Sequence, residues 1–323
     1  MAAIDHPPYA DYIGRGMDRA EVVMRGLTKD YGEGRGLFNL DLEVADKEIF
    51  GYLGPNGAGK TTTIRLLMGM IRPTAGSATI RGLDCQKDAV KVKRRVGYLP
   101  GELPQFGGLR GSEVVAYLGW LRGGVDKSRV KSLAERFELD LAIRFREYSR
   151  GNKQKLGIVL AFMHRPDLLI LDEPTGGLDP LNQQEFYRLV LEAKADGATV
   201  FLSSHVLSEV EHVCDRVGII RHGRLIRVAE LEDLHEIRLH KVEIAFVSSV
   251  PIDLVNEVAG VENLKVDGRR LHCTVRGSFE PFMRAISGTG IASLVSHEPT
   301  LEEIFLAYYR DEPSPAAEPV AVT

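Results

Sequence analysis

The chain has 323 residues and a formal net charge of −4, with 44% hydrophobic and 27% charged residues. This composition is that of a soluble globular protein, and the length suffices for one large domain and one small one. A slightly acidic chain has no strong basic field, so we expect no nucleic-acid partner. The apolar run at 156–163 is far too short to span a membrane. If the protein acts at a membrane, another chain must supply the spanning part.

The first part of the chain predicts a β-rich opening behind a short extension. Residues 1–20 are mixed and polar, and we expect an N-terminal extension there. Hydrophobic and polar residues then alternate over 21–27 and 40–44, which is the pattern of half-buried strands. A short apolar strand is expected at 48–53, directly before a glycine-rich loop.

The glycine-rich loop has the complete spacing G-x-x-x-x-G-K-[ST] of a phosphate-binding loop, and a helix candidate follows at 61–68. Its glycines let backbone N–H groups turn toward phosphates, and the helix N-terminus adds its positive dipole end. We expect Lys60 to reach the β- and γ-phosphates and the Thr61 hydroxyl to bind Mg²⁺. The candidate nucleotide-binding residues of this segment are Gly54, Pro55, Asn56, Gly57, Ala58, Gly59, Lys60, Thr61 and Thr62.

The middle of the chain predicts an α/β core with an insertion. Helical periodicity from about 101 to 150 indicates a helical subdomain inserted into the core. The core resumes with a helix at 153–162 and a buried strand at 166–171. A further helix at 186–195 and a buried strand at 198–202 follow. Strands that are apolar on both faces are typical of parallel sheets, and their alternation with helices defines the α/β class.

Two acidic residues follow the strand that ends at Leu171. Asp172 lies where the strand end would bring a carboxylate near the phosphates, and we expect it to hold Mg²⁺ through water. Glu173 comes next and is placed to polarise the attacking water. The alternative is an ordinary strand end with surface acids, and the phosphate-binding loop in the same chain argues against it.

Further segments resemble the ATP-binding cassette (ABC) family. Residues 172–180 are similar to the family's acidic motif and the D-loop behind it, which includes Asp179. Residues 201–205 are similar to the strand that ends in the family's switch histidine, here His205. Tyr31 lies where the family places an aromatic ring against adenine. The resemblance implies a P-loop NTPase nucleotide-binding domain with a β-rich subdomain, a parallel-sheet core and the inserted helical subdomain.

The resemblance covers about residues 21–234 and implies a mechanism. Two copies are expected to face each other head to tail and to trap two ATP molecules, each between the phosphate loop of one copy and the signature loop of the other. The signature, usually Leu-Ser-Gly-Gly-Gln, reads here Tyr148-Ser149-Arg150-Gly151-Asn152. Ser149, Gly151 and Asn152 keep groups that should meet the γ-phosphate, whereas Arg150 replaces a glycine. Taken alone, Ser149 would be an ordinary helix cap.

A second departure from the family follows residues 97–100. The family usually has a glutamine there that reaches the Mg²⁺ site. Gly101 occupies that position, Glu102 follows it, and Gln105 is nearby but displaced. Two interpretations stay open, because either Glu102 takes over as a metal ligand or the contact is absent.

Three segments together resemble the ATPase subunits of ABC-2-type exporters, including the daunorubicin-resistance kind. They are residues 97–102, 148–155 and 298–305. The resemblance implies a Mg²⁺-dependent ATPase that energises export of a small or lipid-like molecule through separate transmembrane permease subunits, at the cytoplasmic face of the plasma membrane. The alternatives are an importer ATPase with a regulatory C-terminal domain and a soluble ABC ATPase without a transport role.

A second pattern begins after about residue 234. Predicted strands and helices follow the order β-α-β-β-α-β within residues 235–310, which is typical of a small ferredoxin-like α+β domain. No residue in this part resembles a phosphate ligand, so we expect an accessory or regulatory role. The Pro- and Ala-rich tail at 311–323 is expected to be disordered.

Overall fold

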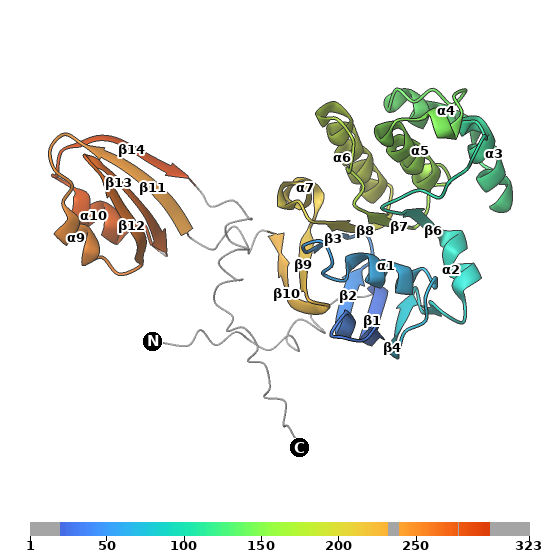
Figure 1. Cartoon of the computed structure of the whole chain (residues 1–323), viewed down its shortest axis with the longest axis horizontal. Coiled ribbons are helices and arrows are strands. Elements are labelled where there is room, and N and C mark those ends of the chain that lie inside the picture. Colours follow the sequence, from blue (N-terminus) through green and yellow to red (C-terminus); the bar gives the residue numbers. More distant parts are fainter. Residues whose placement is uncertain (1–19, 232–238, 277, 298–323) are drawn as a thin grey trace, which may run out of the picture. The chain divides into compact units, whose positions relative to one another are not determined.

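The computed structural model describes residues 20–231, 239–276 and 278–297 (Figure 1). The chain divides into two compact units, the first ending at Glu230 and the second beginning at Leu231. Each unit has a hydrophobic core of its own. The expected N-terminal extension, the expected boundary near residue 234 and the expected tail fall on residues outside the described ranges, apart from residue 20 itself, and stay predictions.

The first unit is built around a six-stranded sheet. Its strands are β3 (Ile49–Leu53), β6 (Val96–Leu99), β7 (Leu168–Asp172), β8 (Thr199–Ser204), β9 (Arg216–Arg221) and β10 (Arg224–Glu230). They lie in the order β10-β9-β3-β8-β7-β6. All neighbouring pairs are parallel except the edge pair β9–β10. Strands β3, β7 and β8 are buried along their whole length, as expected for a parallel sheet covered on both faces.

Seven α-helices and a 3-10 helix accompany this sheet among the described residues of the first unit. They are α1 (Lys60–Leu67), α2 (Ala89–Arg95), α3 (Gly111–Leu121), α4 (Lys127–Arg136), the 3-10 helix η2 (Phe145–Glu147), α5 (Arg150–Phe162), α6 (Pro180–Ala195) and α7 (Leu207–Val213). Figure 1 shows α5 and α6 on one side of the sheet and α1 on the other. The predicted helical subdomain contains α3, α4 and η2.

A second, antiparallel sheet packs against α1. It consists of β1 (Ala20–Asp30), β2 (Gly36–Ala45), β4 (Ala75–Ile80) and β5 (Leu83–Asp84), in the order β2-β1-β4-β5. One buried cluster joins this sheet, α1 and the six-stranded sheet through residues such as Leu42, Ile64 and Phe50. The predicted β-rich opening is therefore confirmed, and its core includes Ala58 of the phosphate loop.

Two helices begin earlier than the sequence pattern predicted. Helix α5 begins at Arg150 because the side chain of Ser149 accepts a hydrogen bond from the backbone N–H of Asn152 and caps the helix. Helix α6 begins at Pro180 because Asp179 caps it and proline suits the first helical position. The added residues are mostly polar, and the one leucine among them, Leu181, is exposed, so hydrophobic periodicity alone does not reveal these turns.

The second unit has the predicted β-α-β-β-α-β order. Its elements are β11 (Leu239–Phe246), α9 (Ile252–Asn256), β12 (Val261–Asp267), β13 (Arg270–Arg276), α10 (Glu280–Ile286) and β14 (Ile291–His297). The sheet order is β12-β13-β11-β14 and every neighbouring pair is antiparallel. Its core includes Ile244, Leu271 and Phe282. This is the ferredoxin-like arrangement expected from the sequence.

Candidate functional site

The predicted phosphate-loop, acidic and histidine residues gather at the carboxyl ends of three adjacent strands. The phosphate loop follows Leu53 at the end of β3, Asp172 ends β7, and His205 follows the last residue of β8. These strands are neighbours in the order β3-β8-β7 and run parallel. Ligands of open α/β sheets bind at this edge. The topology therefore brings together residues that lie more than a hundred positions apart in the chain.

Glycines shape the phosphate loop (residues 54–61). A Cβ on Gly54 would lie 2.4 Å from the carbonyl oxygen of Ile220, so no larger residue fits there. Gly59 has φ 116° and precedes the first turn of α1. Pro55, Asn56 and Gly57 are exposed, which leaves the outer side of the loop open to a ligand.

The Lys60 side chain folds back into the loop and is almost fully buried. Its Nζ donates to the carbonyl oxygens of Gly54 at 2.5 Å and of Pro55 at 3.3 Å. It also lies 3.1 Å from Oε1 of Glu173. A buried ammonium group needs such partners to offset its loss of hydration. The loop thus holds a compact positive charge beside the acidic end of β7.

Asp172 is held by two hydroxyl groups. Thr61 Oγ1 donates to Asp172 Oδ2 at 2.9 Å, and Ser203 Oγ donates to Asp172 Oδ1 at 2.6 Å. Asp172 is only 2% exposed, so these bonds keep the carboxylate satisfied in a poorly hydrated place. One carboxylate and one hydroxyl next to a phosphate loop match the few oxygen ligands that Mg²⁺ takes from proteins when phosphates supply the rest.

Glu173 and His205 form the outer part of the cluster. His205 Nδ1 lies 2.6 Å from Glu173 Oε2. Glu173 has φ 50°, in the left-handed region that costs energy for a residue with a side chain. Its backbone N–H donates to the carbonyl oxygen of Ser203 at 3.1 Å, which helps to fix this conformation. The carboxylate therefore lies between the Lys60 ammonium and the His205 ring.

The signature residues lie on a neighbouring loop and helix start. Ser149 caps α5, and a Cβ on Gly151 would lie 2.7 Å from the carbonyl oxygen of Gly177. The start of α5 therefore packs tightly on the β7–α6 loop (residues 173–179). Among the described residues, no hydrogen bond or ion pair joins Ser149, Gly151 or Asn152 to the phosphate loop. The structure of one chain thus leaves the signature and the phosphate loop as separate groups.

The remaining predicted residues take different positions. Tyr31 is half exposed, and the Lys29 ammonium lies 5.5 Å from its ring centre. The Asp179 carboxylate accepts hydrogen bonds from the backbone and side chain of Asn182, and these bonds lower its pKa. Glu102 is exposed and has no hydrogen bond or ion pair with any described residue.

Position 101, rather than 102, lies beside the acidic cluster. A Cβ on Gly101 would lie 3.5 Å from Asp172 Oδ2, which is an ordinary contact distance. A side chain at this position would therefore point at the carboxylate without a clash. The metal role of Glu102 stays a prediction.

Sequence reasoning missed three polar residues that organise the site. Ser203 holds Asp172, as described above. Gln154 on α5 donates to the backbone oxygens of Pro174 at 2.7 Å and Glu173 at 3.3 Å. The buried carboxylate of Glu209 accepts hydrogen bonds from Thr175 and from Ser204. Ser203 and Ser204 are the only polar residues in the second half of strand β8, which is otherwise apolar there. This pair was the sequence signal that could have predicted the hydrogen bonds to Asp172 and Glu209.

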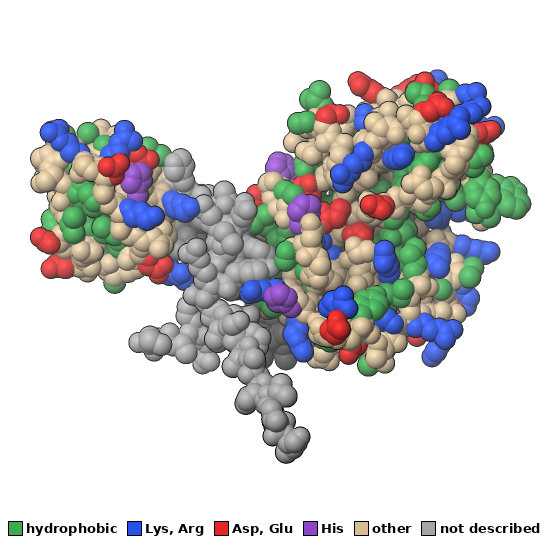
Figure 2. All heavy atoms as spheres, in the orientation of Figure 1, with side chains coloured by type: hydrophobic (Ala, Val, Ile, Leu, Met, Phe, Trp, Pro, Cys, Tyr) green, Lys and Arg blue, Asp and Glu red, His purple; other side chains and the backbone are tan. Residues whose placement is uncertain are grey.

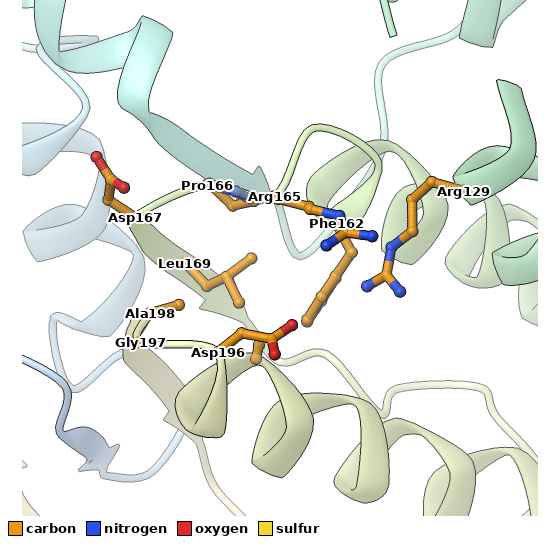
Figure 3. A pocket seen from close by; sticks show the side chains of 10 residues that line it. Arg129, Phe162, Arg165, Pro166, Asp167, Leu169, Asp196, Gly197 and Ala198 are labelled. Atoms are coloured by element: carbon orange, nitrogen blue, oxygen red, sulfur yellow. The ribbon is translucent and has the colours of Figure 1, made fainter. Parts of the chain in front are cut away.

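A separate pocket lies at the opposite ends of the same strands (Figure 3). Its volume is about 290 Å³, and Asp167, Leu169 and Ala198 line it at the amino ends of β7 and β8. Arg129 and Arg165 project toward it (Figure 3). Because Asp172 ends β7 and His205 directly follows β8, both lie at the carboxyl ends of these strands, and the pocket is no part of the candidate nucleotide site.

Comparisons with known proteins agree with this geometry. The model of the ABC transporter family matches residues 37–176. The bacitracin transport ATP-binding protein BcrA of Enterococcus faecalis is 38% identical over 218 residues, which are 67% of this chain and 71% of that protein. The chain belongs to the ABC transporter ATP-binding family. An uncharacterized ABC transporter ATP-binding protein, YhaQ of Bacillus subtilis, is 30% identical over 288 residues, 87% of this chain and 95% of its own length.

Solved structures confirm the fold of this ABC protein. An ATP-binding subunit of an ABC transporter superposes with a TM-score of 0.62 and 30% identity, over 67% of this chain and 92% of that chain. The predicted P-loop NTPase fold is therefore confirmed, and so is its assignment as an ATPase. In the described parts of the chain, every helix is too short or too polar to cross a lipid bilayer.

Proposed function

We propose that this ABC ATPase binds MgATP at the carboxyl edge of β3, β8 and β7. The phosphate loop with Lys60 would hold the β- and γ-phosphates, and the Tyr31 ring would stack on the adenine. Thr61 and Asp172 would hold Mg²⁺, whose charge neutralises the phosphate oxygens when bound. The single observation that carries this proposal is the cluster in which Lys60, Glu173 and His205 meet beside the Thr61–Asp172 pair.

In this site Glu173 is proposed as the group that activates water. The carboxylate would orient a water molecule toward the γ-phosphate and accept its proton as the bond to the β-phosphate breaks. His205 hydrogen-bonds the same carboxylate and would keep it directed at the water. ATP phosphates would compete with Glu173 for the Lys60 ammonium, so nucleotide binding would free the carboxylate for its role.

The separation of signature and phosphate loop supports a head-to-tail homodimer. Among the described residues, no hydrogen bond or ion pair joins Ser149, Gly151 or Asn152 to the phosphate loop of their own chain, so a second copy is the natural source of the facing surface. The ABC cassette MJ0796, described as dimeric, has the same fold with a TM-score of 0.58 and 22% identity. Asp179 at the start of α6 would lie at the same dimer interface.

Export is the proposed direction of transport. The relatives include BcrA, a bacitracin transport protein, and the probable multidrug protein YbhF of Escherichia coli, which is 34% identical over 218 residues. These names support an exporter ATPase at the cytoplasmic face of the plasma membrane with separate permease subunits. The narrower likeness to daunorubicin-resistance subunits rests on the sequence motifs at 97–102, 148–155 and 298–305 alone.

An apolar surface on the helical subdomain fits a permease partner. Trp120 is 74% exposed, and Tyr117 and Leu121 on the same helix are more than half exposed. Hydrophobic side chains gather over α3 at the right edge of Figure 2. Between α3 and α4 lies a groove of about 700 Å³. Contiguous exposed apolar side chains of this kind mark interaction surfaces.

Phosphate release from ATP tests the proposed site. The wild-type chain should hydrolyse ATP only with Mg²⁺ present, and Lys60→Ala should lose binding of a fluorescent ATP analogue because the main positive charge is removed. Lys131→Ala, which removes an exposed lysine on α4, is the charge-matched control. Unchanged nucleotide affinity in Lys60→Ala would show that this loop is not the nucleotide site.

A further inference from the structure

Arg150 stands where the family signature has a glycine, and its side chain lies along the β7–α6 loop. A Cβ on Gly177 would meet Arg150 Cγ at 3.2 Å and Nε at 3.5 Å, and one on Gly176 would meet Nη2 at 4.0 Å. The guanidinium group therefore lies over two glycines, between the Glu173 and Asp179 ends of that loop. Among the described residues, no side chain of the β7–α6 loop forms a hydrogen bond or ion pair with this guanidinium group.

The charge of Arg150 is not neutralised within its own chain. Arg150 is exposed, and among the described residues none makes a hydrogen bond or ion pair with it. The nearby acids already have partners, since Glu173 contacts Lys60 and His205 and the Asp179 carboxylate accepts bonds from Asn182. The guanidinium is therefore free to bind an anion from outside the chain.

Arg150 also lies at a position where a positive charge is electrostatically unfavourable. Arg150 is the first residue of α5, and the first turn of that helix contains no acidic residue. A positive charge at a helix N-terminus opposes the helix dipole and is disfavoured. The charge of Arg150 therefore does not stabilise the free chain. An anionic partner at this surface would explain why a positively charged residue occupies the position.

We propose that Arg150 binds the γ-phosphate of the ATP held by a second copy of this chain and stabilises its transfer. This inference rests on the proposed head-to-tail dimer, in which the signature loop faces the phosphates of the partner. Lys60 would approach the phosphates from within the phosphate loop, and Arg150 would approach them from the opposite side. The planar guanidinium suits phosphate oxygens, and an arginine supplied from another chain stabilises phosphoryl transfer in other nucleotide hydrolases.

Two substitutions separate this role from a packing role on Gly176 and Gly177. Arg150→Gln keeps much of the side-chain length and loses the charge, whereas Arg150→Lys keeps the charge. We expect Arg150→Gln to lower kcat about 10- to 100-fold, the effect of one charged hydrogen-bonding group. Arg150→Lys should retain most of the rate, and the exposed Lys131→Ala should match wild type. A wild-type rate in Arg150→Gln, or equal losses in both Arg150 variants, would overturn the proposal.

A mixing experiment tests whether Arg150 acts on the partner's nucleotide. Chains with Arg150→Gln are mixed with chains carrying Glu173→Gln, and phosphate release is followed over a single turnover. The mixed dimer has one complete site, made of Glu173 from one chain and Arg150 from the other. We expect a fast burst of phosphate that neither variant gives alone. No burst from the mixture would contradict action across the interface.

The outcome for Arg150 is separable from the outcome for the proposed function. ATP-dependent dimerisation of Glu173→Gln, measured by light scattering, tests the dimer without involving Arg150. If this variant dimerises with ATP and Arg150→Gln hydrolyses ATP at the wild-type rate, the Arg150 proposal is wrong and the dimer stands. If Glu173→Gln stays monomeric with ATP, the proposed dimer is wrong, and the Arg150 proposal is overturned with it.

Discussion

At the scale of single residues, the site is a set of charges that satisfy one another before any nucleotide binds. Lys60 is paired with Glu173, which is also bonded to His205, while Asp172 is held by hydroxyl groups. Each buried charge needs these partners because isolated burial is costly. The phosphates of ATP can replace Glu173 at Lys60 without leaving that ammonium group unpaired.

Ser203 offers a direct test of how Asp172 is held. Ser203→Ala removes the 2.6 Å hydrogen bond to Asp172 Oδ1 and leaves the carboxylate oxygen without that donor. Removing such a bond to a buried charged group costs about 1.5–3 kcal/mol. We expect weaker Mg²⁺ binding, seen as a higher Mg²⁺ concentration for half-maximal ATP hydrolysis. An unchanged Mg²⁺ titration would mean that Ser203 does not position the metal ligand.

At the scale of elements, the motifs that carry chemistry were the most predictable parts of the chain. The phosphate loop and the acidic end of β7 have fixed residue types at fixed spacing, because backbone and side chains meet the phosphates directly. The first turns of α5 and α6 were not predicted, since polar caps set their starts and the hydrophobic period begins later. The partners Ser203, Gln154 and Glu209 depend on tertiary contacts that no local pattern records.

The contact between α5 and the β7–α6 loop leads to a steric prediction. A Cβ on Gly151 would lie 2.7 Å from the carbonyl oxygen of Gly177, closer than real side chains come to backbone. Gly151→Ala should therefore displace the loop that carries Glu173 at its start and lower ATP hydrolysis at least about tenfold, the effect of a small misplacement of a catalytic group. The check is the ATPase rate alongside the melting temperature. A wild-type rate would show that the loop adjusts freely.

The loop that follows α5 leads to a prediction about pH. Burial and the Arg122 guanidinium lower the pKa of His164 from 6.5 to about 4. The unfolded chain therefore binds more protons than the folded chain between these pH values, and stability falls as the pH drops through this window. His164→Asn should reduce the loss of melting temperature between pH 6.5 and pH 4. The same loss in wild type and variant would show that another group causes it.

At the scale of the whole molecule, the nucleotide chemistry and the C-terminal unit are separate in the chain. Every predicted nucleotide residue lies before Glu230, and the second unit has its own core around Ile244, Leu271 and Phe282. The order of its strands and helices along the chain was predictable from alternating hydrophobic residues and turn residues. Its role was not, because the described residues of this unit contain no group of side chains that could hold a metal ion and no recognised phosphate-binding motif.

A truncation tests this division. A chain ending at Glu230 should fold and bind a fluorescent ATP analogue with an affinity close to that of the full chain, because all its phosphate ligands remain. We expect it to show weaker dimerisation, measured by sizing with and without ATP, or weaker assembly with permease subunits. Weaker nucleotide binding by a folded truncated monomer would show that the second unit contributes to the site.

The most direct test of the central account is Glu173→Gln measured for both hydrolysis and assembly. The substitution keeps the shape of the side chain and removes the carboxylate that is proposed to activate water. We expect ATP binding to persist, phosphate release to fall at least about 100-fold, and a stable ATP-bound dimer to accumulate on a sizing column. Hydrolysis near the wild-type rate would contradict the role of Glu173, and a monomer at saturating ATP would contradict the dimer.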